Sequence, residues 1–456
     1  MRGQLGLYTL VINLGLLSFA INTFVVAGIM PSVVADIGGM RLYSWTFGMF
    51  SVGSVIGAAS SGPLRETFGG REAYVLAGAA FLAGLGLAAL APNMETLVAA
   101  RFLQGLGGGA IASQVYAIMA ALFPERLRGH VIAFTSTAWG VATALGPALG
   151  GLFAEAGWWR GAFWGMSPLV LAFMGLALRV IPKEEAHGRL AALPYLRLLM
   201  LAASVLVLSW TSQSDSGALR LVLIVASVVL AILAFRRDSR AANPMFPKGA
   251  LRLGSEIGAI YWILLLNSVV ITFVNTYATL HMQVLHGASP LTASYLYIAV
   301  SVGWSASSFI VPGWRGRMEV FGIVFGLAIV LAGAIGTGYV VTRGPIGIII
   351  TFMFVLGLGI GFMNSPLVQR AIRISPDHER HIAGASVQTM RTMGVAFGAA
   401  AVGLVAVAAG LVADAATPAV VAHAMQWVYA GAAAVAFLCL LCVFPVIAAH
   451  RRSVSP

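Results

Sequence analysis

Two arginines stand inside long apolar stretches of this chain, and each has a glutamine three residues away. Arg101 precedes Gln104, and Arg391 follows Gln388. Residues three apart share one face of a helix, so each pair projects to the same side. A guanidinium in such surroundings can hold an anionic or carboxylate-bearing molecule by charge-assisted hydrogen bonds. It can also act as a structural anchor that bonds glutamines and backbone carbonyls between helices. Both interpretations stay open.

Acidic side chains, unlike these two arginines, lie outside the apolar stretches. All 15 Asp and Glu residues fall in predicted loops or at the edges of apolar stretches. A carboxylate that carries a proton across a membrane has to lie inside it, and the sequence predicts none there. His281 and His423 could relay protons, but we expect both to be solvated at the membrane interface. No nucleotide-binding loop, metal-ligand cluster or nucleophile–base pattern is visible, so we expect no cofactor and no enzymatic activity.

The apolar stretches identify an integral membrane protein. The chain has 456 residues, of which 59% are hydrophobic and 9% charged, and its mean hydropathy is +0.92. A spanning helix needs about 20 mostly apolar residues. Fourteen segments meet that requirement, at 5–30, 42–61, 73–91, 96–122, 131–153, 161–181, 194–213, 219–235, 257–282, 290–311, 320–341, 345–369, 383–411 and 419–447.

The placement of basic residues agrees with this number of helices. Most Lys and Arg residues lie in loops on one side, and the other side has only Arg41, Arg160, Arg220 and Arg343. Because basic residues favour cytoplasmic loops, both termini are predicted to be cytoplasmic. The net charge of +12 is therefore a topology signal. Since it is spread over short loops, it does not indicate nucleic-acid binding.

Two long polar connections, Pro182 to Leu193 and Arg236 to Glu256, divide the segments into six, two and six. We therefore expect an all-α membrane protein with 14 transmembrane helices. Residues 1–192 and 241–456 would form two six-helix bundles, and residues 193–240 two additional central helices. Duplicated halves are typical of secondary transporters, whose substrate site lies between the halves near the middle of the membrane.

A glycine–proline run, Gly146-Pro147-Ala148-Leu149-Gly150-Gly151, lies within segment 131–153. Pro147 has no amide hydrogen for the carbonyl of Thr143, so it should bend the helix. Gly146 and Gly150 share a face without side chains, which lets another helix backbone come close. The run predicts a packing seam or hinge between the halves of a protein with two alternating shapes.

Three motifs resemble signatures of the major facilitator superfamily. The stretch from Gly62 to Arg71 resembles its loop signature G-x-L-x-D-x-x-G-R-[RK], with Glu66 at the usual Asp position. Arg101 to Gly105 resembles R-x-x-Q-G. The glycine–proline run resembles the signature G-x-x-x-G-P-x-x-G-G of the exporting branches, with Ala142 in place of its first glycine. Glu66 can cap a helix or pair with an arginine, so Glu66 and Arg71 are predicted to form a cytoplasmic latch.

The resemblance covers nearly the whole chain. The run from Asn243 to Arg252 resembles the segment before span nine of the fourteen-span drug:proton antiporter subfamily. This resemblance implies proton-coupled export of drug-like molecules by alternating access in the inner membrane of a bacterium. The subfamily usually has an Asp in span one, nine residues before a proline. Here Asn22 stands nine residues before Pro31, and an amide cannot titrate.

In the architecture of this family, the first and fourth helices of each half line the cavity. The resemblance and the interior polar and aromatic side chains together give a substrate-binding set of Asn22, Phe24, Arg101, Gln104, Trp139, Asn267, Asn275, Asn364 and Arg391. The predicted gating or hinge residues are Glu66, Arg71, Gly146, Pro147, Gly150 and Gly151.

The expected function is therefore secondary active export of small amphipathic or drug-like molecules by a monomer in the lipid bilayer. Protons are the coupling ion that the resemblance implies, although the missing acid at Asn22 weakens that implication. Two alternatives stay open. One is a uniporter or exchanger of organic anions that uses Arg101 and Arg391. The other is a membrane receptor or assembly partner without transport.

Overall fold

The computed structural model describes residues 3–184, 195–241, 244–296, 298–311, 313–376, 379–412 and 417–454. Every regular element in these ranges is a helix. The chain divides into two compact units, and each is considered by itself. Unit 1 comprises Met1–Leu198 and Ser289–Tyr295, and unit 2 comprises Leu199–Ala288 and Leu296–Pro456.

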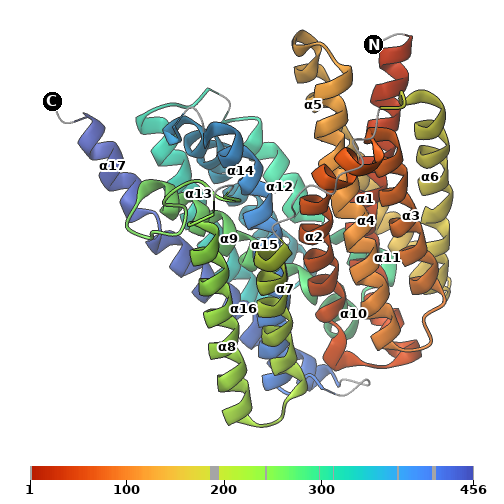
Figure 1. Ribbon diagram of the computed structural model, residues 1–456. Helices are drawn as coiled ribbons and strands as arrows, with labels where there is room; N and C mark the ends of the chain where they lie inside the picture. Colours follow the sequence, from red (N-terminus) through yellow and green to blue (C-terminus); the bar gives the residue numbers. More distant parts are fainter. Residues whose placement is uncertain are drawn as a thin grey trace. The chain divides into compact units, whose positions relative to one another are not determined.

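Unit 1 is built from the first six long helices and one short helix from later in the sequence (Figure 1). Its helices are α1 (Gln4–Ile37), α2 (Trp45–Phe68), α3 (Gly70–Ala89), α4 (Met94–Leu122), α5 (Glu125–Glu155), α6 (Trp159–Val180) and α11 (Pro290–Leu296), with the 3-10 turn η1 at Met40–Leu42.

Unit 2 contains the remaining helices. They are α7 (Tyr195–Trp210), α8 (Gly217–Asp238), α9 (Glu256–Thr276), α10 (Ala278–His286), α12 (Ile298–Ser308), α13 (Arg317–Val340), α14 (Ile346–Ile374), α15 (Arg380–Ala408), α16 (Pro418–Leu441) and α17 (Phe444–Val454), with the 3-10 turn η2 at Thr211–Gln213. The last residue of α11 belongs to unit 2, and the first four residues of α7 belong to unit 1.

The two units repeat one packing pattern. In unit 1, α1 packs on α5 and α6, α4 packs on α2 and α3, and α3 packs on α6. In unit 2, α9 packs on α15 and α16, α14 packs on α12 and α13, and α13 packs on α16. The order of the helices along the chain is the same in both sets. This agreement is what a duplicated six-helix unit would produce.

Glycines repeat between the units as well. A Cβ on Gly53 or Gly105 would overlap a backbone carbonyl across the α2–α4 contact. A Cβ on Gly303 or Gly357 would do the same across the α12–α14 contact. Backbones can approach this closely only where both helices lack side chains, so each pair fixes the spacing of its two helices.

Capping residues begin several helices where the sequence changes from polar to apolar. The side chain of Asn93 accepts a hydrogen bond from Thr96 N at the start of α4, and Ser255 accepts one from Gly258 N at the start of α9. Thr417 caps α16, which has Pro418 at its first turn. Each cap satisfies an amide that has no partner within the helix.

All fourteen predicted apolar segments coincide with helices, but their ends and continuity differ from prediction. Among the described residues, 11 helical segments are long and apolar enough to cross a membrane. The other three predicted spans correspond to α2, α4 and the α11–α12 pair. The first two contain polar side chains such as Arg65 and Arg101, and position 297, between α11 and α12, lies outside the described residues. The fourteen-span arrangement stays a prediction.

One interruption and one extension are visible only in the structure. The predicted loop from Gly62 to Phe68 is the last part of α2, and the chain turns at Gly69, whose φ of +89° is accessible mainly to glycine. Predicted segment 257–282 is divided into α9 and α10 at Tyr277. Segment 290–311 corresponds to α11 and α12, and position 297 between them lies outside the described residues.

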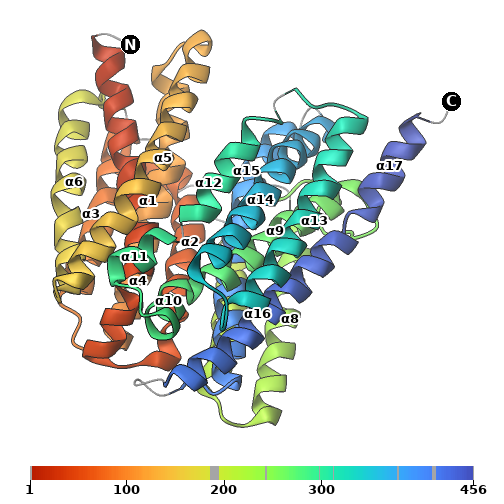
Figure 2. The same ribbon diagram turned by 180° about the vertical axis from the view of Figure 1, so that it is seen from behind.

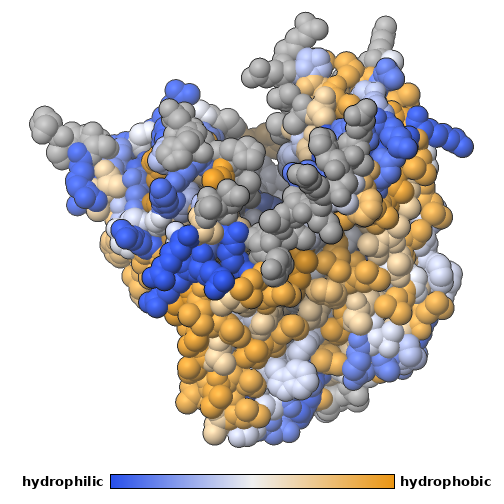
Figure 3. Space-filling model, viewed as in Figure 1, coloured by the Kyte–Doolittle hydropathy of each residue, from blue (hydrophilic) through white to orange (hydrophobic). Residues whose placement is uncertain are grey.

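The surface of α8 shows the character of a helix in lipid. Its exposed side chains include Leu221, Val222, Val225 and Val228, each more than half exposed. In Figure 3, an apolar surface covers this helix and hydrophilic side chains gather beyond its end. Apolar residues gain nothing from packing inside the protein when the surrounding solvent is hydrocarbon, so such exposure is expected of a spanning helix.

Candidate functional site

Arg101 of α4 is buried inside unit 1, with 1% of its surface exposed. Its Nε donates to the carbonyl of Thr46 (3.2 Å), and its Nη1 donates to Asn22 Oδ1 (2.5 Å) and to Gln104 Oε1. The centre of the Phe50 ring lies 4.1 Å from the guanidinium carbon. These partners are all neutral, so carbonyl dipoles and an aromatic face offset the buried charge.

Asn22 of α1 and Gln104 of α4 extend this cluster to two further helices. Asn22 Nδ2 donates to Gln104 Oε1 (3.2 Å) and approaches the sulfur of Met166 in α6 (3.8 Å). Gln104 Nε2 donates to the carbonyl of Gly84 in α3 (3.0 Å). Both side chains have no exposed surface. The cluster therefore joins five helices, α1, α2, α3, α4 and α6, through polar bonds inside the bundle. We call it the Arg101 cluster.

The amide of Asn22 suits this position in a way that a carboxylate would not. It accepts a hydrogen bond from Arg101 and donates one to Gln104 at the same time. An ionised Asp has two acceptor oxygens and no hydrogen to donate. With Asn22 in place, the cluster satisfies its polar groups without an acid, and it holds no carboxylate that could take up a proton.

Aromatic side chains extend from this cluster onto the surface of unit 1. Phe19 stacks on Phe50 with ring centroids 5.7 Å apart and meets Trp139 edge to face at 6.1 Å. Trp139 is 38% exposed and Tyr116 57%. The predicted binding residue Phe24 is partly buried in α1. Exposed aromatic faces of this kind can bind flat, apolar molecules.

Arg391 in unit 2 differs from Arg101 in exposure. Its Nη2 donates to Oδ1 of Asn364 in α14, so two predicted binding residues are joined. Arg391 is partly exposed. Gln388 donates to Thr392 of its own helix (3.4 Å). Of the two arginines that could hold an anion, Arg391 is therefore the accessible one.

The other two predicted binding residues in unit 2 lie on α9. Asn267 is 7% exposed, and Asn275 is partly buried. The Oδ1 atom of each is buried and has no hydrogen-bond partner within the described structure. An unsatisfied buried carbonyl is costly, so native proteins seldom keep one without a functional reason.

The glycines of the α5 seam pack against α1 and α11 within unit 1. A Cβ on Gly150 would lie 2.6 Å from the carbonyl oxygen of Val25, and one on Gly146 would overlap Phe24. A Cβ on Gly151 would lie 2.5 Å from Cα of Leu291 in α11. Pro147 lies inside α5, which runs unbroken from Glu125 to Glu155.

Helix α11 is held against α5 by polar bonds as well as by glycine. Leu291 N donates to Glu155 Oε1 (3.3 Å), and the hydroxyl of Tyr295 donates to the carbonyl of Ala144 (3.5 Å). Ser294 of α11 faces Gly28 of α1. Figure 2 shows α11 beside α1 and α5, although about 135 residues separate α11 from α5 along the chain.

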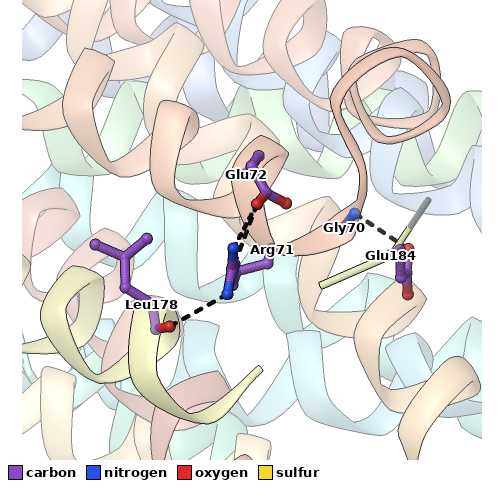
Figure 4. Close-up of polar contacts among 5 residues, drawn as sticks. All are labelled: Gly70, Arg71, Glu72, Leu178 and Glu184. Atoms are coloured by element: carbon purple, nitrogen blue, oxygen red, sulfur yellow. Dashed lines mark hydrogen bonds and ion pairs between the residues drawn. The ribbon is translucent and has the colours of Figure 1, made fainter. Parts of the chain in front are cut away.

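The predicted latch residues Glu66 and Arg71 have different surroundings. Glu66 is exposed and makes no hydrogen bond or ion pair with any residue that the structure describes. Arg71 pairs with Glu72 (2.7 Å) and donates to the carbonyl of Leu178 (3.5 Å), as Figure 4 shows. Its contacts therefore join α3 to the end of α6.

Glu184 makes the contacts that the sequence predicted for Glu66. Its carboxylate pairs with Arg65 at the end of α2 (2.6 Å) and accepts a hydrogen bond from Gly70 N at the start of α3 (3.1 Å; Figure 4). This is an arginine pair and a helix N-terminal contact made by one acid. The acid comes from the segment after α6 because the chain returns to this end of unit 1 there.

Unit 2 contains a second ionic cluster. Arg370 of α14 pairs with Glu256 of α9 and, at 3.5 Å, with Glu319 of α13. Arg373 also pairs with Glu319 (2.5 Å). Glu319 has no exposed surface, and its Oε1 lacks a hydrogen-bond partner in the described part of the chain. This Glu319 cluster joins α9, α13 and α14.

His281 contradicts its predicted environment. The sequence indicated a solvated position at the membrane interface, whereas the residue has no exposed surface and lies on α10 against Tyr429 of α16. The prediction assumed one continuous helix from 257 to 282. Helix α10 packs on α16, and this packing encloses the His281 side chain.

Several site residues could not have been selected from the sequence. Thr46, Gly84 and Met166 contact the Arg101 cluster through a backbone carbonyl or a sulfur, and neither leaves a sequence signal. Glu184 was visible only as one acid in a polar connection. Among the described residues, no three His, Cys, Asp or Glu side chains gather as metal ligands do.

Comparison with known proteins supplies the family. The family model described as Major Facilitator Superfamily matches residues 12–399. A probable multidrug-efflux transporter of Mycobacterium tuberculosis is 31% identical over 408 residues, which are 86% of this chain and 85% of that protein. The chain belongs to the major facilitator superfamily. It is therefore a multi-pass membrane transporter and not an enzyme.

Other similarities agree with this assignment. The multidrug efflux pump LfrA of Mycolicibacterium smegmatis is 25% identical over 87% of this transporter and 79% of that protein. The crystal structure of a D-xylose–proton symporter has a TM-score of 0.65 at 18% identity and covers 97% of this chain and 98% of that one. The likeness to the symporter shows a shared all-helical fold.

Proposed function

We propose that this transporter exports small amphipathic or drug-like molecules across the inner membrane of a bacterium by alternating access. The observation that carries the proposal is the similarity over most of the chain to a multidrug-efflux relative, with the aromatic surface around Trp139. Exposed aromatic faces bind apolar cations and neutral molecules without demanding one shape. The repeated packing of the two units supports the rocking of two bundles.

The proposed architecture is that of the fourteen-span drug:proton antiporters. Residues 1–192 and 241–456 form the six-helix bundles, and residues 193–240 add two central spans. The apolar surface of α8 supports a spanning role for the added pair. Both termini lie in the cytoplasm, the transporter works as a monomer, and protons drive export.

The substrate-binding set divides by accessibility in this proposal. Asn22, Arg101 and Gln104 are fully enclosed and anchor unit 1, so they act on the substrate only by shaping the bundle. Trp139 and Arg391 keep exposed surface and meet the substrate directly. Phe24, Asn267, Asn275 and Asn364 remain candidate cavity residues because their helices are the ones that line the cavity in the proposed architecture.

Transport of organic anions is the second candidate, because Arg391 is a partly exposed cation. Purified transporter in lipid vesicles distinguishes the two functions when uptake of ethidium, an amphipathic cation, is compared with uptake of fluorescein, an organic anion. We expect an imposed pH gradient to drive accumulation of ethidium. Gradient-driven accumulation of either probe would exclude uniport, and movement of fluorescein alone would favour the anion transporter.

The variant Arg101→Ala tests the alternative that the protein is a receptor without transport activity. The substitution removes the central donor of the Arg101 cluster, so substrate-dependent flux should disappear. Flux that disappears in the variant and is present in the unmodified transporter excludes a receptor without transport activity.

A further inference from the structure

The imidazole of His281 is an isolated buried base in unit 2. It has no exposed surface, and its Nδ1 lies 3.1 Å from the carbonyl oxygen of Tyr277. A carbonyl only accepts hydrogen bonds, so Nδ1 carries the hydrogen and Nε2 presents a bare lone pair. Nε2 is buried and has no hydrogen-bond partner among the described residues.

The groups facing His281 offer no charge to balance a proton. His286 of α10 is 6.5 Å away and Tyr429 of α16 is 5.8 Å away, measured between ring centroids. The Nε2 of His286 already lies 2.8 Å from the carbonyl of Val341. Tyr277, at the junction of α9 and α10, presents its carbonyl.

The helices packed around α10 are also uncharged there. Neither α10 nor α16 contains Asp, Glu, Lys or Arg. The acid of α9, Glu256, is the first residue of that helix, whereas α10 follows its last residue. Glu256 pairs with Arg370 of α14. The other histidine of α16, His423, is exposed and contacts Trp427. In this conformation a protonated His281 would be a buried cation without a neighbouring counter-charge.

The helix that carries His281 has a boundary at each end. Helix α10 has nine residues, with the interruption at Tyr277 before it and Gly287 after it, whose φ is +62°. A glycine in the left-handed region ends the helix sharply. A short helix between two such points can shift as a unit and place Nε2 against water or an acceptor.

We propose that His281 is the group that binds and releases the coupling proton of this transporter. Nε2 accepts a proton from water in a conformation that exposes it to water or an acceptor, and it returns the proton to water before α10 reaches the arrangement described here, in which Nε2 is enclosed. Proton binding and the position of α10 are then thermodynamically linked. This inference rests on proton-driven export, and it supplies a titrating group where Asn22 cannot titrate.

Transport in lipid vesicles tests the role of His281. The variant His281→Gln keeps a polar side chain, but its amide cannot bind or release a proton. We expect it to move ethidium down a concentration gradient, whereas its accumulation under an imposed pH gradient should fall to the level reached without the gradient. His423→Gln, which changes the exposed histidine of α16, should behave as the unmodified transporter does.

Two transport results would overturn the inference. One is full gradient-driven accumulation by His281→Gln, and the other is an unmodified transporter that carries ethidium but ignores the pH gradient. If the unmodified transporter moves no ethidium even down a gradient, the proposed export of drug-like cations fails instead.

Nuclear magnetic resonance of histidine labelled with nitrogen-15 then decides the inference without transport. The His281 signal, assigned by its loss in His281→Gln, should show the Nδ1–H neutral form at alkaline pH and change to the protonated form as the pH is lowered. A signal that stays neutral throughout would overturn the proposal.

Discussion

Arg101 illustrates how a single buried charge can be held by neutral groups. Its guanidinium uses Nε for Thr46 and Nη1 for both Asn22 and Gln104, a pattern that depends on the planar fork of arginine. Arg101→Lys keeps the charge and loses the fork. We expect the variant to lose about 3 kcal/mol of stability, in the range found when a buried polar network is broken.

Thermal unfolding in detergent measures this loss. Arg179→Lys, which alters an exposed arginine near the end of α6, is the matched control and should leave the midpoint unchanged. Equal midpoints for Arg101→Lys and Arg179→Lys would show that the Arg101 cluster does not stabilise unit 1.

Replacing the amide of Asn22 by a carboxylate tests whether position 22 affects proton coupling. Asn22→Asp places a titratable oxygen where Oδ1 now accepts a hydrogen bond from Arg101, so the transport rate should acquire a new pH dependence. The measurement is the initial rate of ethidium transport in vesicles as pH is varied. A profile identical to that of the unmodified transporter would mean that position 22 takes no part in coupling.

At the scale of helices, the α1–α5 contact depends on the absence of side chains. Gly150→Val should destabilise unit 1 by about 2 kcal/mol, because a Cβ there would lie 2.6 Å from the carbonyl oxygen of Val25. Gly140→Ala on the same helix adds a Cβ into open space and should be neutral or stabilising. Thermal unfolding compares the two, and an unchanged midpoint for Gly150→Val would argue against a close seam.

The Glu319 cluster makes a parallel prediction for unit 2. Glu319→Gln removes the charge shared by Arg370 and Arg373 and should cost about 3 kcal/mol, since it leaves a buried arginine with one acidic partner fewer. Arg317→Gln, at the exposed first residue of the same helix, is the control. If the two variants unfold at the same temperature, the cluster adds no stability.

The limits of sequence interpretation appear at this scale. Apolar length located the helices because a buried backbone in lipid must be helical. The sequence could not predict the interruption at Tyr277, because neither proline nor glycine marks it, so the burial of His281 was missed. The pairing of Glu184 with Arg65 joins residues far apart in sequence, and only the folded chain shows it. Arg101, Gln104 and Asn22 stand out in the sequence as polar residues within apolar stretches, and the structure buries all three in one cluster, whereas their part in substrate binding stays a prediction.

For the whole molecule, the proposed topology can be tested at the two ends of α8. In a chain without Cys439 and Cys442, Ser216→Cys and Ser239→Cys place one thiol at each end of this helix, and both positions are exposed. A membrane-impermeant maleimide should label position 216 in intact cells and position 239 only after permeabilisation, because basic residues follow α8. Labelling of both positions in intact cells would contradict a spanning α8.

Export by living cells is the most direct test of the function proposed for this transporter. The measurement is the rate at which ethidium leaves preloaded cells of an efflux-deficient bacterium that produces the chain, against cells that produce Arg101→Ala at the same membrane level. We predict faster, energy-dependent loss of ethidium with the unmodified transporter and background loss with the variant. Background loss with both, despite the protein in the membrane, would contradict export of drug-like cations.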